Sequence, residues 1–375
     1  MKFSNTIVCI FLALCSLPAL AHKASDSYLV LSVKSNEVSG QWDIALRDLD
    51  FALGLDANGD GDITWGEVRA RHADIAAYAM GRLTVQRGGH CPLRVTEHLI
   101  DTHTDGTYAV LRFNGTCPSA AAALALNYRL LFDLDALHRG LLRLDLDGTT
   151  QTAVLGPDTG TLTLQAADAS RLGQFVQFWV EGIWHIWIGF DHILFLLSLL
   201  LPAVLIHEAR RWQGVATFRT ALSEVLWVVT AFTVAHSITL TLAALQIVSL
   251  PSRWVESAIA ASVVLAALNN LWPVVERRRW LVAFSFGLIH GFGFASVLTE
   301  LGLPADTLVL SLLGFNLGVE TGQLAIVAGF LPAAYLLRNS ALYRKGLFIG
   351  GSALTLLIAL VWFVERAFDL KLITA

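Results

Sequence analysis

The sequence has few charged residues and no excess of basic ones. Asp, Glu, Lys and Arg make up 15% of its 375 residues and hydrophobic residues 55%, whereas soluble domains average roughly 25% and 45–50%. The net charge of -4 offers no positive field to nucleic acid, which excludes a nucleic-acid partner. The mean hydropathy of +0.60 is too high for a soluble protein and too low for a chain lying wholly in a membrane. A chain that is half soluble domain and half membrane domain would have this value.

Residues 1–21 have the features of a secretory signal peptide. Lys2 supplies the positive start, residues 7–17 form a short apolar core, and Ala19-Leu20-Ala21 matches the small-residue cleavage pattern. The apolar run is too short to span a bilayer comfortably, and an uncleaved anchor is the alternative. The leader predicts that the segment after it is exported across the bacterial inner membrane.

Cysteine is also scarce, with four residues in the whole chain. Cleavage would remove Cys9 and Cys15, so that only Cys91 and Cys117 remain. An even pair in an exported domain is most simply a disulfide. The alternative is a metal site built on two thiolates, but the sequence lacks the close C-x-x-C spacing that such sites use.

Residues 22–170 are predicted to form an extracytoplasmic, mainly-β domain. Short stretches of alternating polar and apolar residues are separated by Gly-, Asn- and Asp-rich breaks, and several short strands at this spacing favour a β-sandwich. The predicted strands are 28–33, 41–46, 108–113, 141–146 and 160–164, with one helical insertion at 64–80.

Residues 56–67 match the calcium-binding loop of an EF-hand. Oxygen-bearing side chains occupy the first, third, fifth and last loop positions, and Gly61 stands where the chain has to turn sharply. The predicted Ca²⁺ ligands are Asp56, Asn58, Asp60, Asp62 and Glu67. The alternative is an Asp-Gly-rich turn that holds no metal. Because the sequence has one such loop, we expect a structural calcium clamp rather than a sensor switch.

Residues 171–375 are predicted to form an all-α polytopic membrane domain in contact with the lipid bilayer. Six apolar stretches are long enough to span it, near 184–205, 221–247, 254–275, 280–300, 307–335 and 346–364. The first, third and fifth connections between them carry most of the arginine. The positive-inside rule therefore predicts that these connections are cytoplasmic and that both termini lie outside.

Polar and ionisable residues recur in five of the six predicted spans, where such residues are costly and usually mark function. His185 and His192 are seven residues apart and share one helix face, and Asp191 can orient an imidazole. The predicted transition-metal ligands are His185, Asp191, His192, His236, His290 and Glu320, with Ser237, Glu256, Asn316 and Gln323 as supporting polar groups. Imidazoles with carboxylates suit nickel, cobalt or zinc. The alternative is that these residues only make interhelical hydrogen bonds.

Four short elements occur together in the membrane half: His185-x-x-x-Gly189-x-Asp191-His192, His236-Ser237, His290-Gly291 and Asn316-x-x-x-Glu320. In these elements residues 175–366 resemble the HupE/UreJ family, whose members are associated with hydrogenase and urease maturation and are thought to move nickel. The combination of a signal peptide, a β domain and an EF-type loop resembles the longer branch of that family. The resemblance implies a metal ion as ligand and a metalloenzyme maturation pathway as partner.

Three functions compete on this evidence. The first is an inner-membrane permease for nickel or cobalt, or a metallocentre accessory protein. The second is a membrane-embedded zinc-dependent hydrolase, in which histidines hold zinc with one open position and Glu256 or Glu320 is the general base. The third is a receptor-like scaffold that presents the β domain. A continuous polar path across the inner half would favour transport, and Asn269, Asn270 and Gln323 are the main candidates for it.

Overall fold

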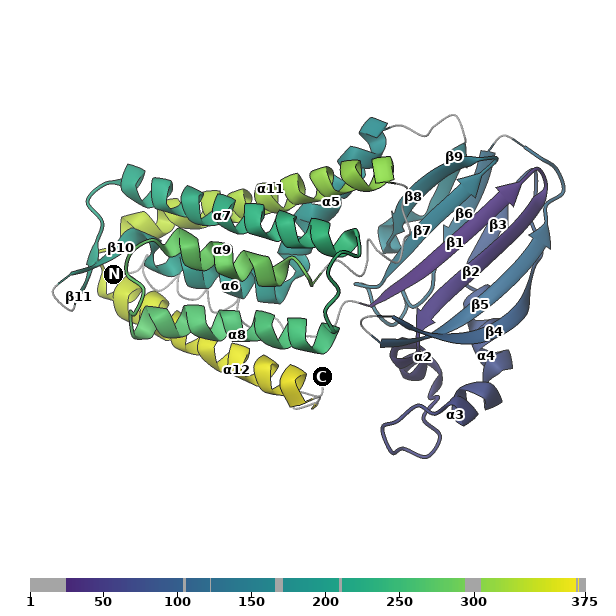
Figure 1. Cartoon of the computed structure of the whole chain (residues 1–375), viewed down its shortest axis with the longest axis horizontal. Helices are drawn as coiled ribbons and strands as arrows, with labels where there is room; N and C mark the ends of the chain where they lie inside the picture. Colours follow the sequence, from purple (N-terminus) through teal and green to yellow (C-terminus); the bar gives the residue numbers. More distant parts are fainter. Residues whose placement is uncertain are drawn as a thin grey trace, which may run out of the picture.

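The computed structural model describes residues 25–103, 106–121, 123–165, 171–208, 211–293, 305–368 and 370. An N-terminal domain built on β-sheets is followed by a helical domain (Figure 1). The chain thus has a sheet domain and a helical region, whereas the predicted bounds 22–170 and 171–375 stay predictions. The predicted signal peptide, residues 1–21, lies outside the described residues and stays a prediction.

A six-stranded mixed sheet forms the larger part of the N-terminal domain. The strand order is β4-β5-β2-β1-β7-β8, and β1 pairs in parallel with β7 whereas the other neighbours are antiparallel. Its strands are β1 (Asp26–Lys34), β2 (Glu37–Ala45), β4 (Leu93–His103), β5 (Gly106–Thr116), β7 (Arg139–Leu146) and β8 (Thr149–Leu155). The predicted strands 28–33, 108–113 and 141–146 lie within β1, β5 and β7.

A second sheet and three helices cover this sheet. The second sheet has the order β3-β6-β9, with β3 (Leu83–Gln86), β6 (Ala123–Tyr128) and β9 (Thr161–Gln165); the one-turn helix η1 is Pro157–Thr159. The helices are α2 (Leu46–Leu53), α3 (Trp65–Ala70) and α4 (His72–Met80). Buried side chains from both sheets and from α2 and α4 form one continuous hydrophobic core. This shared core gives the domain the two-layer character that the sequence predicts.

The predicted disulfide is present. Cys91 and Cys117 are bonded, and both are buried in the core that the two sheets share. The bond joins the chain just before β4 to the end of β5, two neighbouring strands of the larger sheet. It therefore ties the edge of the sheet to the core.

The helical domain begins with a broken helix. Helix α5 (Arg171–Ile188) is followed by α6 (Phe190–Leu200) and the short helix η3 (Leu201–Val204), and the chain bends by 73° at the break. A hairpin of β10 (Leu205–Glu208) and β11 (Arg211–Gly214) comes next. The remaining helices are α7 (Phe218–Ala244), α8 (Ser252–Leu271), α9 (Arg279–His290), α11 (Ala305–Leu337), the π-helical segment η4 (Leu342–Gly350) and α12 (Gly351–Phe368).

Among the described residues, four helices are long and apolar enough to cross a membrane, or five spans if the bent pair counts as one. The multi-pass membrane domain is therefore confirmed. The single helix predicted over 184–205 is wrong: the helix starts earlier, breaks at Gly189 and has ended when β10 begins. The predicted span 280–300 corresponds to α9, which has 12 residues, together with residues 294–300, which lie outside the described part.

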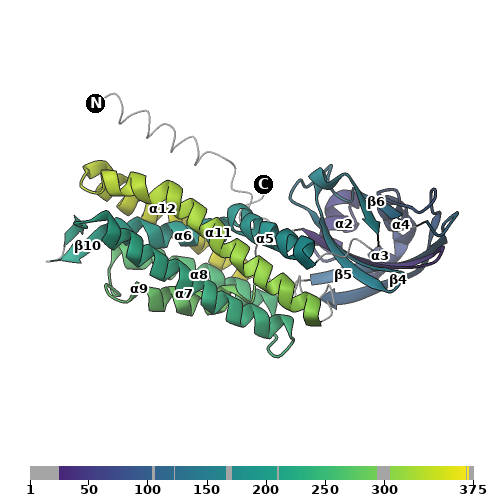
Figure 2. The ribbon, with the colours of Figure 1, turned by 90° about the horizontal axis from the view of Figure 1, so that it is seen from above.

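Helices α5 and α11 lie side by side in Figures 1 and 2, and small residues let them pack closely. A Cβ added at Gly318 would lie 2.0 Å from the carbonyl oxygen of Trp179 on α5. The two backbones therefore touch at this point, which only glycine permits. This contact holds the middle of α5 against the middle of α11.

One end of α5 also touches the N-terminal domain. With its side-chain amide turned so that both atoms find partners, Gln177 pairs with the main chain of the edge strand β8, donating to the Thr152 oxygen (3.2 Å) and accepting from the Val154 nitrogen (2.8 Å). An edge strand leaves main-chain groups unpaired, and Gln177 satisfies two of them. The helix that carries His185 is thus linked to the β domain.

A chain of hydrogen bonds runs through the interior of the β domain and ends on His138. The indole of Trp42 donates to Ser27 (3.2 Å), whose hydroxyl shares a hydrogen bond with Tyr128 (2.7 Å), and the Tyr128 hydroxyl contacts His138 Nε2 (2.7 Å). The other ring nitrogen, His138 Nδ1, contacts the Ser25 hydroxyl (2.6 Å), and this hydroxyl donates to the carboxylate of Asp48. Burial lowers the pKa of His138 to about 3, so the imidazole is neutral in the folded protein.

We expect His138 to make the β domain less stable as the pH falls. The unfolded chain takes up the proton near pH 6.5, whereas the folded chain does so near pH 3. The folded state therefore binds fewer protons in this window, and the free energy of unfolding falls by about 1.4 kcal/mol for each pH unit below 6.5. Guanidinium unfolding at pH 6.5 and pH 5, followed by circular dichroism of the strands in detergent, should show a loss of about 2 kcal/mol.

The His138→Gln variant is the control for this expectation. Glutamine does not titrate, so the variant should lack the part of the pH dependence that is due to His138, although it starts from a lower stability. An equal change in the variant and in the native chain between pH 6.5 and pH 5 would contradict the assignment.

Candidate metal centre

The break between α5 and α6 brings two histidine rings together edge to face. His185 lies in the last turn of α5 and His192 in the first turn of α6, with ring centroids 4.6 Å apart. Gly189 occupies the break, and a Cβ there would lie 2.7 Å from the His185 carbonyl oxygen and 2.9 Å from His192 Nδ1. Glycine is required because the backbone passes this close to the imidazole.

Asp191 orients His192. Its Oδ1 accepts one hydrogen bond from the His192 backbone nitrogen (3.0 Å) and one from His192 Nδ1 (3.1 Å). A carboxylate can only accept, so the proton of the neutral ring is on Nδ1 and the lone pair is on Nε2. A carboxylate behind a histidine in this way is the usual outer partner of a metal-binding imidazole.

Asn316 orients the ring of His236, as Asp191 orients the ring of His192. Helix α7 carries His236, which is fully buried, and its Nδ1 donates to Asn316 Oδ1 on α11 (3.2 Å). The amide nitrogen of Asn316 donates to the Leu312 carbonyl oxygen (2.9 Å), which fixes the orientation of the amide. The lone pair of His236 is therefore on Nε2.

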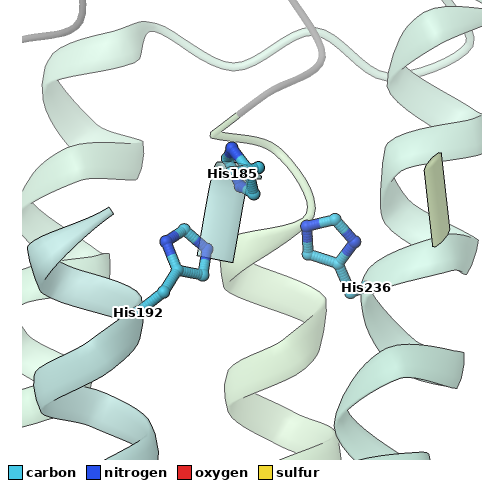
Figure 3. Close-up of side chains that lie close together, drawn as sticks. All are labelled: His185, His192 and His236. Carbon is cyan, nitrogen blue, oxygen red and sulfur yellow. The ribbon is translucent and has the colours of Figure 1, made fainter. Parts of the chain in front are cut away.

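The three imidazoles converge. Nitrogen atoms of His185, His192 and His236, one from each residue, lie within 4.8 Å of one another. Figure 3 shows the rings around a common space, to which α5, α6 and α7 contribute one ring each. Two nitrogens that bind one tetrahedral zinc ion at about 2.1 Å are roughly 3–4 Å apart. The observed spacing is therefore close to that of a three-histidine metal site.

His290 lies on the edge of this cluster. Its ring centroid is 5.3 Å from that of His192, and it is buried at the end of α9. Ser262 of α8 donates to the Ile259 carbonyl oxygen (2.6 Å) and so accepts from His290 Nε2 (2.9 Å). The lone pair of His290 is then on Nδ1. Sequence reasoning missed Ser262, although a serine in the middle of a predicted apolar span was a signal for it.

The nitrogen atoms that carry these lone pairs are the ones left without a partner. His192 Nε2, His236 Nε2 and His290 Nδ1 are buried and accept no hydrogen bond from any residue that the structure describes. A buried polar atom without a partner costs about 1–3 kcal/mol, and more is expected in hydrocarbon. A divalent cation at the centre would satisfy at least two of these atoms at once. The chemistry of the donor set therefore fits a transition metal.

The other predicted polar residues do not join the cluster. Glu320 accepts from Thr230 (2.9 Å), and Gln323 accepts from Thr233 (3.2 Å). Ser237 donates to a carbonyl oxygen of its own helix, and Glu256 contacts Ser252 and Arg366. The structure thus brings His185, His192 and His236 together, with Asp191, Asn316 and His290 against them.

The predicted calcium loop is closed by its own side chains. Asp56 accepts from the backbone nitrogens of Gly59 (2.7 Å) and Gly61 (2.9 Å), and both glycines have positive φ. Glu67 accepts from the backbone and hydroxyl of Thr64 (2.9 and 2.7 Å), and Thr64 caps α3. These hydrogen bonds, the backbone one most, lower the pKa of Glu67. The lowered pKa favours the charged form of Glu67, which a cation requires.

The comparison with known families matches the helical half of the chain. The model of the HupE / UreJ protein family matches residues 161–366, which is more than half of the chain and includes every residue of the histidine cluster. No curated protein matches the chain.

We expect the Gly189→Ala variant to destabilise the helical domain. The added methyl group would overlap the His185 carbonyl oxygen and the His192 ring, and overpacking of this kind costs about 1–3 kcal/mol. Thermal unfolding in detergent, followed by tryptophan fluorescence, should show a lower Tm. Gly329→Ala on α11 is the matched control, because a Cβ there meets no atom within 4 Å. Equal Tm values for the two variants would contradict the close approach at Gly189.

Proposed function

This chain belongs to the HupE/UreJ family, and on that premise we propose that it handles a divalent transition metal, as a permease or as an accessory protein for a metallocentre. The convergence of His185, His192 and His236 inside the membrane domain carries the proposal. We infer that these three imidazoles are the ligands and that Asp191 and Asn316 hold two of them in the tautomer that a metal needs. Imidazole ligands favour nickel, cobalt or zinc over calcium or magnesium.

Within this proposal His290, which lies beside His192, is a further ligand of the ion. Its Nδ1 is directed by the hydrogen bond between Nε2 and Ser262. Glu320 lies one helical turn from Asn316 on α11 and is the nearest acid along that helix. An ion that leaves the histidines along α11 would meet this carboxylate.

One observation favours a second candidate, a membrane-embedded zinc-dependent hydrolase. The asparagines predicted to continue a polar path are engaged in structural hydrogen bonds. Asn269 accepts from the backbone nitrogens of Val274 and Val275, and Asn270 donates to Ser198 and Ser352. These contacts occupy the asparagines of the predicted path. They therefore favour a centre that retains a metal ion and activates water, rather than one that passes the ion across the membrane.

We also propose the orientation that the arginine distribution predicts, in the inner membrane with the β domain and the C-terminus outside the cytoplasm. The arginines of the connection between α8 and α9, Arg277 and Arg278, would then be cytoplasmic. A cysteine introduced at position 278 should react with an impermeant maleimide only after the cells are opened.

We expect the purified full chain to bind close to one equivalent of nickel, cobalt or zinc, and His192→Ala or His236→Ala to lose that binding. Each variant removes one of three ligands. Asn316→Leu keeps all three but removes the acceptor behind His236, and loss of such an outer partner lowers metal affinity about 10–100-fold. Metal content and competition with a chromophoric chelator would measure these changes.

His207→Ala is the matched control for the metal measurement, because His207 lies in β10 and pairs with Glu276 (2.7 Å) away from the cluster. It should bind metal as the native chain does. Metal uptake into vesicles separates the two candidates, since a hydrolase holds its ion without moving it. Native protein that binds no more metal than the triple alanine variant of the three histidines would contradict both.

We propose in addition that residues 56–67 bind Ca²⁺ through Asp56, Asn58, Asp60, Asp62 and Glu67. The complete spacing of oxygen ligands supports this, as do the positive φ of Gly61 and the flanking helices α2 and α3. Extracytoplasmic modules bind calcium with affinities of about 0.1–1 mM. A clamp of that strength would be filled outside the cell and would fix the insertion between β2 and β3.

Calorimetry of the full chain in detergent should show one calcium site, and Glu67→Gln should abolish its heat. The variant replaces the Glu67 carboxylate, which stands at the last loop position and can supply both of its oxygens to calcium. Asp101→Asn, an exposed acid on β4, is the control and should leave the heat unchanged. Absence of heat from the native chain at millimolar calcium would refute the site.

A further inference from the structure

A groove between α7 and α11 opens beside the histidine cluster and encloses about 600 Å³. The two helices lie side by side in Figures 1 and 2. Its rim is apolar, and Val234, Ile238, Leu313 and Leu317 are 45–55% exposed there. Because both helices are membrane spans, this exposed rim is continuous with the surface that contacts lipid. The medium that reaches the groove is therefore hydrocarbon.

Five of the ten lining residues are polar and present mainly acceptors, although the exposed surface of the groove is mostly apolar. Ser237 and Thr241 line it, and their hydroxyls donate to carbonyl oxygens of their own helix (2.7 Å each), so their free lone pairs remain as acceptors. Glu320 lines it as well, and its carboxylate accepts from Thr230. A ligand that satisfies these oxygens has to bring its own hydrogen-bond donor.

The groove is separated from the metal centre by one side chain. Asn316 lines the groove and at the same time accepts from His236 Nδ1 (3.2 Å). A molecule bound against this wall would therefore lie next to the group that orients a candidate metal ligand.

The volume of the groove and the residues that line it indicate which kind of molecule it can bind. The lining of α7 runs from Thr233 to Leu242, which is roughly 14 Å at 1.5 Å per residue. A partner helix of about 10 Å diameter and this length would fill roughly 1,100 Å³, well above the volume of the groove. Half of the lining is apolar and opens to lipid, which disfavours a hydrated cation. A single alkyl chain with a donor group fits both the size and the chemistry.

We propose that this groove binds the alkyl chain of a membrane amphiphile that carries a hydroxyl or an amine, with the donor group on Glu320 and Ser237. The site does not require the metal to be present. It extends the proposed function, because an amphiphile held here contacts Asn316 and so lies beside the histidine centre.

The test uses the full chain in phosphatidylcholine nanodiscs and a photoreactive dodecanol. Labelled peptides should come from residues 233–242 and 313–320. Unlabelled dodecanol or dodecylamine should compete about tenfold better than dodecyl methyl ether, since a hydrogen bond to a charged group is worth roughly that factor. The ether has the same apolar chain but no donor, so equal competition by alcohol and ether would overturn the proposal.

Leu317→Trp is the variant that tests the position, because it fills the rim of the groove. It should reduce labelling of both segments at least about fivefold, whereas Leu336→Trp should not. Leu336 is 80% exposed on the same helix and does not line the groove. Labelling that Leu317→Trp leaves unchanged would also overturn the proposal. Metal content measured on the same samples keeps this result separate from the metal hypothesis, since Leu317→Trp retains every ligand.

Discussion

Inside a membrane there is no water to satisfy a polar group, so each imidazole nitrogen must find its partner within the protein. Asp191 and Asn316 provide that partner for one nitrogen of His192 and His236, and Ser262 provides it for His290. The same contacts decide which nitrogen of each ring keeps its lone pair. The remaining nitrogens of His192, His236 and His290 are buried, carry lone pairs and accept no hydrogen bond from the described residues, which leaves them available to a metal ion.

The close packing of the helices follows from this constraint. The partners of His236 and His290 come from other helices, α11 and α8, so those helices have to approach closely. Gly318 allows α11 to touch the backbone of α5, and Gly189 allows the chain to turn between His185 and His192. Glycine costs helix stability in the interior of a helix. The cost is offset here because the backbone contacts place the polar groups within hydrogen-bonding distance.

The two candidate cation sites offer different types of ligand, and each type suits the surroundings of its site. The loop 56–67 is exposed and offers carboxylate oxygens, which suit a hard cation that is abundant in water. The membrane cluster offers neutral imidazoles, which do not add charge to hydrocarbon and suit a transition metal. Helix α5 connects the two halves, since Gln177 pairs with β8 and His185 lies two turns further along. The groove between α7 and α11 adds an opening to lipid beside the same cluster.

The sequence alone determined the features that depend on local pattern or on counting. Alternation predicted β1, β5 and β7, the remaining pair of cysteines predicted the disulfide, and apolar length predicted a multi-pass membrane domain. The residues of the cluster were also named from the sequence, because a histidine within an apolar span is conspicuous. The strands β3, β4, β6 and β8 were missed; in β4 and β8 the exposed faces weaken the alternation.

Only the tertiary structure decided which polar residues meet. Asn316 and Glu320 are one helical turn apart on α11, and Glu320 was predicted as a metal ligand and Asn316 as a supporting group. Asn316, however, contacts His236, whereas Glu320 contacts Thr230. The spacing of seven positions from His185 to His192 indicated one straight helix, but the 73° bend at Gly189 brings their rings together instead. Periodicity fixes the face of a helix on which a residue lies. The partner on that face depends on how the helices cross and break, and contacts between residues far apart in the chain set that geometry.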